Sequence, residues 1–156
     1  MKIRRAFADE LPHLQDIENA SGEPFRAIGM PEIADDDPIS LSLLAASEVW
    51  VAVDSDDVPV AFVALGVVDG VRHIHQVSVH PGHARRGIGA ALISHVAEGP
   101  VSLTTFRDVP WNAPYYARLG FVEMDVLGPE LAAVMAEEAA HGLTGRVAML
   151  LTPPRD

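Results

Sequence analysis

Apolar residues recur along this chain in short runs, and their spacing changes between that of helices and that of strands. Before residue 48 the spacing is helical, because Leu11, Leu14 and Ile17 lie one turn apart behind Asp9, a residue that can cap a helix. The elements that this first part predicts are, in order, a strand at Lys2–Ala6, a helix from Asp9 to about Gly22, a loop at Phe25–Ser40 and a short helix at Ile39–Ala46.

From residue 48 onward, strands alternate with helices. Val49, Val51 and Val53 occupy every second position, which is typical of a strand with one buried face. Turn residues at Asp54–Pro59 separate this strand from the next run and indicate a hairpin. The elements predicted after Ala46 are, in order, strands at Glu48–Val53, Val60–Val67 and Arg72–Val79, a helix at Gly87–Ala97, a strand at Val101–Phe106, a helix at Pro110–Leu119, a strand at Phe121–Val126, a helix at Pro129–His141 and a strand at Arg146–Thr152.

The order of these elements, β-α-α-β-β-β-α-β-α-β-α-β, predicts a mixed α/β fold. Antiparallel hairpins come first, and a strand–helix–strand crossover follows. The length of 156 residues and the hydrophobic fraction of 49% suit one buried core. Because no repeat or linker interrupts the pattern, we expect a single domain over residues 1–156.

Charge and composition exclude several classes of function. A net charge of −11 argues against a nucleic-acid partner, because such a surface needs clustered Lys and Arg. The absence of cysteine excludes disulfides, thiolate metal sites and a cysteine nucleophile. Apolar runs are too short to cross a membrane, and the charges in Met1–Glu10 do not suit a secretory signal. We therefore expect a cytoplasmic protein.

One basic spot stands out in this acidic sequence. Arg85 and Arg86 follow a predicted strand, and Gly87 and Gly89 open the next helix. The first N–H groups of a helix have no partner within it and favour anions. Glycines let a phosphate approach the backbone, and guanidinium groups add paired donors. The segment Arg85–Ala90, which we call the anion turn, is therefore predicted to hold a pyrophosphate.

Other nucleotide motifs do not match the anion turn. The Lys and Ser or Thr of a Walker A loop are missing, and Leu92 stands where a dinucleotide fingerprint would need its third glycine. A bare Gly-x-Gly is more often a helix start with solvated neighbours than a binding site. The two arginines and the preceding Val77-Ser-Val79-His-Pro81 favour the binding interpretation here.

At this point the sequence resembles the GNAT superfamily, the GCN5-related N-acetyltransferases. The family signature, an apolar strand and a Val-x-Pro turn followed by Gln/Arg-x-x-Gly-x-Gly/Ala, corresponds to residues 77–81 and 84–89, with Ala84 at the first signature position. A second family element, an aromatic pair before x-x-Leu-Gly-Phe, corresponds to Tyr115–Phe121. The order of elements also matches, so the resemblance covers nearly the whole chain and is least informative before Glu48.

The resemblance implies that the chain binds acetyl-CoA. Val77 and Val79, with Ser78 between them, would offer backbone groups to the pantetheine and acyl carbonyl. The residues implied to hold the pyrophosphate are Arg85, Arg86, Gly87, Ile88, Gly89 and Ala90. The resemblance also implies a central mixed sheet that is splayed between the strands ending at Val79 and Phe106, so that the cofactor arm can enter.

Acyl transfer from a thioester to an amine needs a proton acceptor and a proton donor. An alkylamine has a pKa of about 10 and must lose a proton. His73 and His75 alternate onto one strand face, and either could accept this proton, although a histidine buried in the core or facing solvent is the more common outcome. Tyr116 lies four residues before Gly120, where family members often place a tyrosine near the thioester sulfur, so Tyr116 is the candidate acid for the leaving thiolate. The alternative is a core ring whose hydroxyl is already hydrogen-bonded. Asn112 is expected to cap the short helix through its side-chain oxygen and is kept as a candidate cofactor contact.

These inferences lead to an acetyl-CoA-dependent N-acetyltransferase that acts on a primary amine by direct attack through a tetrahedral intermediate. The acceptor would be a small molecule or a peptide, and no metal is required. Transfer of a larger acyl group, such as succinyl or propionyl, remains an alternative, as does a non-catalytic CoA-sensing or interaction module. The apolar final strand or the Pro129–His141 helix could form a homodimer face.

Overall fold

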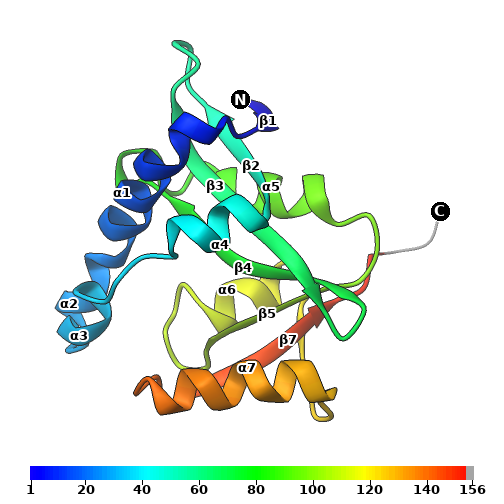
Figure 1. Cartoon of the computed structure of the whole chain (residues 1–156). Helices are drawn as coiled ribbons and strands as arrows, with labels where there is room; N and C mark the ends of the chain where they lie inside the picture. Colours follow the sequence, from blue (N-terminus) through cyan, green and yellow to red (C-terminus); the bar gives the residue numbers. More distant parts are fainter. Residues whose placement is uncertain (154–156) are drawn as a thin grey trace. The chain divides into compact units, whose positions relative to one another are not determined.

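The structure is a computed structural model that describes residues 1–153 (Figure 1). Within these residues seven strands form one mixed sheet in the order β1-β2-β3-β4-β5-β7-β6, which confirms the predicted mixed α/β class. The chain forms two compact units. Unit 1 contains Met1–Leu65 and His75–Val96, and unit 2 contains Gly66–Ile74 and the residues from Ala97 onward. One domain over residues 1–156 stays a prediction.

Unit 1 contains an antiparallel sheet in which the middle strand is buried over most of its length. β2 pairs with its neighbours on both sides, so that Val51 lies opposite Arg4 and Phe62. The strands here are β1 (Lys2–Arg5), β2 (Glu48–Val53) and the first part of β3 (Pro59–Val68), with the last part of β4 (Val71–Val79). The helices are η1 (Ala8–Glu10), α1 (Leu11–Gly22), α2 (Pro24–Ala27), α3 (Pro31–Ala34), α4 (Leu41–Ala46), η2 (Pro81–His83) and α5 (Ile88–Val96).

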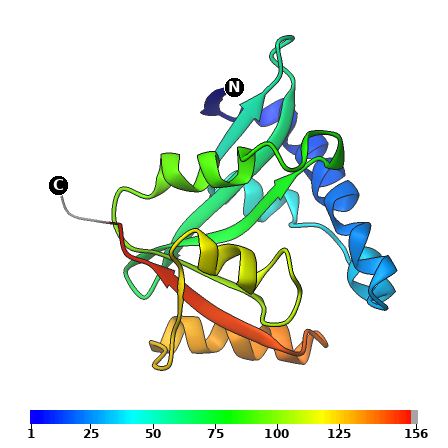
Figure 2. The same cartoon turned by 180° about the vertical axis from the view of Figure 1, so that it is seen from behind.

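Helices cover both faces of this part of the sheet. Figure 1 shows α1 and α4 on one face, and the reverse view in Figure 2 shows α5 on the other. This explains why the run from Val60 to Leu65 is continuously buried rather than alternating. On the α1 side the core consists of Leu14, Ile17, Leu44, Val49, Val51, Val53, Phe62 and Ala64. The predicted buried valine face of β2 is therefore confirmed.

Unit 2 is built around a long antiparallel pair. β5 (Val101–Phe106) pairs with β7 (Arg146–Leu151) along its whole length, and β6 (Val122–Glu123) adds a short edge to β7. The first part of β4 pairs in parallel with β5, Arg72 with Val101 and His73 with Ser102. α7 (Pro129–Ala140) packs on β7 and buries Leu131, and α6 (Ala113–Arg118) joins β5 to β6. The predicted splay between Val79 and Phe106 involves both units and stays a prediction.

Two of the elements predicted from the sequence have different bounds in the structure. The segment predicted as a loop, Phe25–Ser40, overlaps α2 and contains α3, each only one turn long and each started by a proline at its first position. Helices this short show no periodicity in sequence. The strand predicted at Phe121–Val126 shrinks to Val122–Glu123, and beyond it the N–H of Met124 makes one further hydrogen bond to the carbonyl of Ala148 on β7.

The helix predicted to begin with Asp9 also begins differently. Asp9 lies inside the 3-10 turn η1, and Phe7 occupies the capping position. The carboxylate of Glu10 accepts a hydrogen bond from the N–H of Phe7 at 2.8 Å, so a later acidic residue satisfies this backbone donor. Among the described helices, none is long and apolar enough to cross a membrane.

Candidate functional site

The anion turn contains two residues with a left-handed backbone conformation. Figure 2 shows the loop that joins the end of β4 to the start of α5. Arg85 and Gly87 both adopt the left-handed region, with φ of 64° and 73°. An added Cβ on Gly87 would meet nothing within 4 Å, so glycine is favoured there by backbone conformation rather than by space. The left-handed φ of Arg85, a residue with a side chain, is a feature that sequence reasoning missed.

The helix that follows begins with amide donors that have no hydrogen-bond partner among residues 1–153. The first hydrogen bond of α5 runs from the N–H of Ala91 to the carbonyl of Gly87 at 3.0 Å. The N–H groups of Ile88, Gly89 and Ala90 therefore precede the helical ladder and lie at its positive end. Ile88 packs inward with 7% of its surface exposed, which anchors the turn to the core.

The two arginines of the anion turn are unpaired. Arg85 and Arg86 are exposed, and neither forms an ion pair within residues 1–153. By contrast, Arg26 and Arg107 on the surface each bond a carboxylate at 2.6 Å. In a chain of net charge −11, two neighbouring arginines without carboxylates leave their charge available for an anion.

The end of β4 leads directly into the anion turn. Ser78 is buried and accepts a hydrogen bond from the side-chain amide of Gln76 at 2.9 Å, whereas Val77 and Val79, on the opposite strand face, are partly exposed. The N–H of His80 then donates to the carbonyl of Val60 at 2.9 Å and ties the strand end to β3. Val77, Val79 and the anion turn therefore belong to one continuous segment of unit 1.

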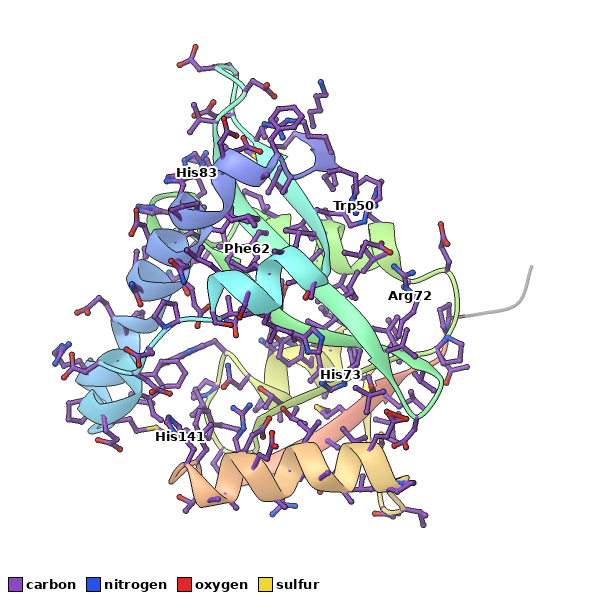
Figure 3. All side chains as sticks on the ribbon, in the orientation of Figure 1. Trp50, Phe62, Arg72, His73, His83 and His141 are labelled. Atoms are coloured by element: carbon purple, nitrogen blue, oxygen red, sulfur yellow. The ribbon has the colours of Figure 1, made fainter. Side chains whose placement is uncertain are left out.

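The two candidate bases lie in different environments. His73 (Figure 3) is 3% exposed, and its Nδ1 lies 2.8 Å from the hydroxyl of Ser102, its partner on β5. His75 is partly exposed, and burial lowers its pKa below the ordinary histidine value. A neutral and partly accessible imidazole can accept a proton, which is the state of His75; the role of either histidine as the base stays a prediction.

Tyr116 lies on α6 among aromatic rings. Its ring packs edge-on against Tyr115 and Phe121, with centroids 5.3 and 5.6 Å away. Burial raises the pKa of the Tyr116 hydroxyl above its usual value, Tyr115 raises it further, and the charge of Arg146 opposes both. The hydroxyl therefore keeps its proton at neutral pH, which is the state that a general acid needs.

Asn112 precedes α6, as predicted, but its side chain does not cap the helix. It is the residue before α6, and its carbonyl accepts a hydrogen bond from the N–H of Tyr116 at 2.9 Å. Its side chain makes no capping bond within the described part of the chain, so that prediction was wrong. The backbone of Asn112, with φ −111° and ψ −115°, is not in the extended conformation that capping side chains normally require. A cofactor contact by Asn112 stays a prediction.

Known proteins place this arrangement in a family. The family model described as an acetyltransferase (GNAT) domain matches residues 45–123, from the end of α4 through β6. Among solved structures, Rv2747 of Mycobacterium tuberculosis in complex with CoA superposes with a TM-score of 0.71 at 21% identity, covering 99% of this chain and 100% of that chain. PaiA N-acetyltransferase of Thermoplasma acidophilum in complex with coenzyme A gives 0.67 at 13% identity, covering 97% and 98%.

A third similar structure is the ribosomal-protein-S18-alanine N-acetyltransferase of Escherichia coli. It has a TM-score of 0.64 and 17% identity, and the match covers 99% of this chain and 95% of that chain. Likenesses at such low identity establish the fold, whereas the family model spans half of the chain and contains β4, the anion turn and α6. The chain therefore belongs to the GNAT acetyltransferase family.

Proposed function

We propose that this protein is an N-acyltransferase that takes an acetyl group from acetyl-CoA and passes it to a primary amine. The observation that carries the proposal is that the guanidinium groups of Arg85 and Arg86 and the N–H groups that open α5 lie side by side in sequence without partners in the described part of the chain. Such a combination binds a diphosphate better than any monovalent anion, because it offers several donors and two positive charges. Membership in an acetyltransferase family makes CoA the expected source of that diphosphate.

The residues present suit CoA at the phosphate end. The amides of Ile88, Gly89 and Ala90 and the side chains of Arg85 and Arg86 would hold the pyrophosphate, and β4 from Val77 to Val79 would receive the pantetheine arm. Bound acetyl-CoA supplies a thioester whose carbonyl carbon an amine can attack directly. Cofactor-bound structures with this fold, from Mycobacterium tuberculosis and Thermoplasma acidophilum, support the choice of CoA.

Two side chains are proposed to move protons. His75, whose pKa burial lowers, is neutral at pH 7 and would accept a proton from the ammonium form of the acceptor. Tyr116, whose pKa burial raises, holds its proton and would donate it to the departing thiolate. A strand N–H, such as that of Val79, would stabilise charge on the carbonyl oxygen.

A thiol-release assay tests the proposal. Purified protein is mixed with acetyl-, propionyl- or succinyl-CoA and a panel of amines, including polyamines, amino acids and peptides with a free N-terminus. The chain has a single lysine, Lys2, so acylation of the enzyme itself is limited to that residue and the N-terminal amine. Release of free CoA with acetyl-CoA and at least one amine supports the proposal. A preference for a larger acyl group would correct the donor, and binding without release in the whole panel would favour a sensor.

Calorimetry with charge variants tests the anion turn separately. We expect Arg85→Gln and Arg86→Gln each to weaken CoA binding by about tenfold or more, because each removes a charge-assisted hydrogen bond. Arg26→Gln is the matched control, since Arg26 is exposed in the same unit but bonded to Glu23 and Asp35. Pantetheine, which carries no phosphate, should bind the unmodified chain and the three variants with equal affinity. Unchanged CoA affinity in both anion-turn variants would contradict the proposed site.

A further inference from the structure

His80, the first residue after β4, binds the neighbouring backbone through three of its own polar groups. Its N–H donates to the carbonyl of Val60 on β3 at 2.9 Å, and its carbonyl accepts from the N–H of His83 at 2.8 Å. Its ring nitrogen Nδ1 accepts from the N–H of Gly82 at 3.0 Å, so the imidazole caps the one-turn helix η2. His80 therefore joins the end of the sheet to the turn that leads into the anion turn.

The imidazole of His80 lies against the backbone of η2, and Gly82 makes this approach possible. A Cβ added to Gly82 would lie 3.3 Å from Nδ1 of His80, which is tighter than an ordinary van der Waals contact. Because Nδ1 accepts a hydrogen bond here, neutral His80 carries its ring proton on Nε2. The ring thus acts on the N–H two residues ahead, as the side-chain oxygen of Asn or Asp does in an Asx turn.

The anion turn begins two residues after η2, and the conformation of its first residue needs support from outside. Arg85 has a φ of 64°, and a residue with a side chain keeps such a conformation only when its surroundings impose it. The side chains of Arg85 and Arg86 form no ion pair within residues 1–153, so they do not fix this shape. Burial of Ile88 fixes the helical end of the anion turn. Its other end therefore depends on η2 and on the bonds of His80.

We propose that His80 is a positioning residue for CoA, because its imidazole caps η2 and thereby holds Arg85 and Gly87 in the conformation that receives the pyrophosphate. This role rests on the proposed function, since it assumes that the anion turn binds CoA. His80 acts on binding of the donor and leaves the chemical step to other residues. Without the cap the anion turn samples other conformations, and CoA binding must then offset the cost of ordering them.

Calorimetry on variants of the full chain at pH 8 tests this role. His80→Ala removes the acceptor of the Gly82 N–H and should weaken CoA binding by about fivefold to tenfold, while the affinity for pantetheine stays unchanged. In His80→Asn the side-chain oxygen can accept from the same N–H, so CoA affinity should return to within about twofold of the unmodified chain. His95→Ala is the matched control, because His95 is an exposed histidine of the same unit in the last turn of α5. At saturating acetyl-CoA, kcat of His80→Ala should equal that of the unmodified chain.

NMR of the protein without CoA tests the cap independently of the proposed function. In the unmodified chain a scalar coupling should connect the amide nitrogen of Gly82 with Nδ1 of His80, because an N–H···N hydrogen bond transmits such a coupling. The amide resonances of Arg85 and Gly87 should move in His80→Ala and return in His80→Asn. The amide of Ala91, which bonds the carbonyl of Gly87 at the start of α5, shows whether the helix remains formed.

Each outcome separates the role of His80 from the proposed function. Absence of the coupling in the unmodified chain would overturn the role of His80, whatever the variants do. Equal losses of CoA affinity in His80→Ala and His80→Asn, or no loss in either, would also overturn it, because the hydrogen bond to Gly82 would then not be what matters. An unmodified chain that shows the coupling but binds no CoA would contradict the proposed function and, with it, the link from His80 to CoA.

Discussion

Single residues in this protein owe their proposed roles to ionisation states that their surroundings impose. Tyr116 among aromatic rings retains its proton, and His75 on a half-buried strand face loses its proton more readily than a free histidine. Burial acts in both cases against the charged form, which is why the phenol and the imidazole shift in opposite directions. The same physical effect thus leaves one group ready to donate a proton and the other ready to accept one.

Replacing Tyr116 by Phe tests the donor. The ring contacts with Tyr115 and Phe121 remain in Tyr116→Phe, so the fold and CoA affinity should change little. Loss of the acid should lower kcat by about a hundredfold, the smaller end of what general acids contribute. Tyr115→Phe is the matched control, because it removes the neighbouring hydroxyl and should leave kcat within about twofold. A Tyr116→Phe enzyme with normal turnover would remove Tyr116 from the mechanism.

The acidic limb of the pH–rate profile tests the acceptor of the proton. Burial lowers the pKa of His75 below its ordinary 6.5, so the base stays neutral until the pH is below 6.5. The value of kcat/KM should therefore stay constant down to that pH and fall only below it. His75→Gln should lower kcat/KM and remove that limb. His73→Gln should disturb stability more than the pH profile, since His73 is buried against Ser102. If only His73→Gln abolished the acidic limb, His73 rather than His75 would be the base.

At the scale of elements, the sequence predicted strands better than helix ends. Glu48–Val53 and Val101–Phe106 occur with the predicted bounds, because period-two patterns and flanking turn residues fix both ends. Capping is harder to predict, because the bonding atom can come from a distant segment. α7 shows this clearly: its capping residue, Gly128, has no side chain, and Asp69 accepts hydrogen bonds from the N–H groups of Glu130 and Leu131 at 2.9 Å.

In the candidate functional site and in α1, features were likewise predictable where the residues involved are neighbours in sequence. The helix start beside Arg85, Arg86 and Gly87 could be predicted because these features are neighbours in sequence, whereas pyrophosphate binding there stays a prediction. The burial of Glu18 was missed, although its place four residues after Leu14 on the buried face of α1 was a usable signal. Its hydrogen-bond partner, the N–H of Ile39, lies 21 residues away, and no local pattern links the two.

Capping of α7 by Asp69 predicts that Gly128→Ser changes stability in opposite directions in the presence and in the absence of the Asp69 carboxylate. Asp69→Ala should lower the free energy of unfolding by about 1–2 kcal/mol, because two helix N–H groups lose their acceptor. Gly128→Ser should destabilise the unmodified chain, since a Cβ there would clash with the carboxylate of Asp69. In the Asp69→Ala background the same serine has room and can cap the helix itself, so it should stabilise. Urea denaturation of the four proteins measures this, and equal effects of Gly128→Ser in both backgrounds would refute the cap.

At the scale of the whole molecule, acidic groups respond to pH in two opposite ways. Glu10 receives hydrogen bonds from Arg4 at 2.7 and 2.9 Å, and these bonds lower its pKa, so its contribution to stability is lost as the pH falls below about 4.5. Glu18 behaves in the reverse way because burial raises its pKa. Ionisation of Glu10 therefore supports the fold, whereas ionisation of Glu18 opposes it.

The pH dependence of unfolding separates these contributions. Folded Glu18 binds its proton up to about pH 7, whereas the unfolded side chain releases it near 4.5, so the folded state holds the extra proton and stability falls as the pH rises across this window. The full loss is at most about 3 kcal/mol, at 1.36 kcal/mol for each pKa unit. His75 works against this trend, since its lowered pKa makes stability rise with pH up to 6.5. Subtracting the Glu18→Gln curve from that of the unmodified chain cancels His75 and Glu10, and the remainder should decline from pH 4.5 to 7 and then stay level. A flat difference would mean that the Glu18 carboxyl is solvated in the folded chain.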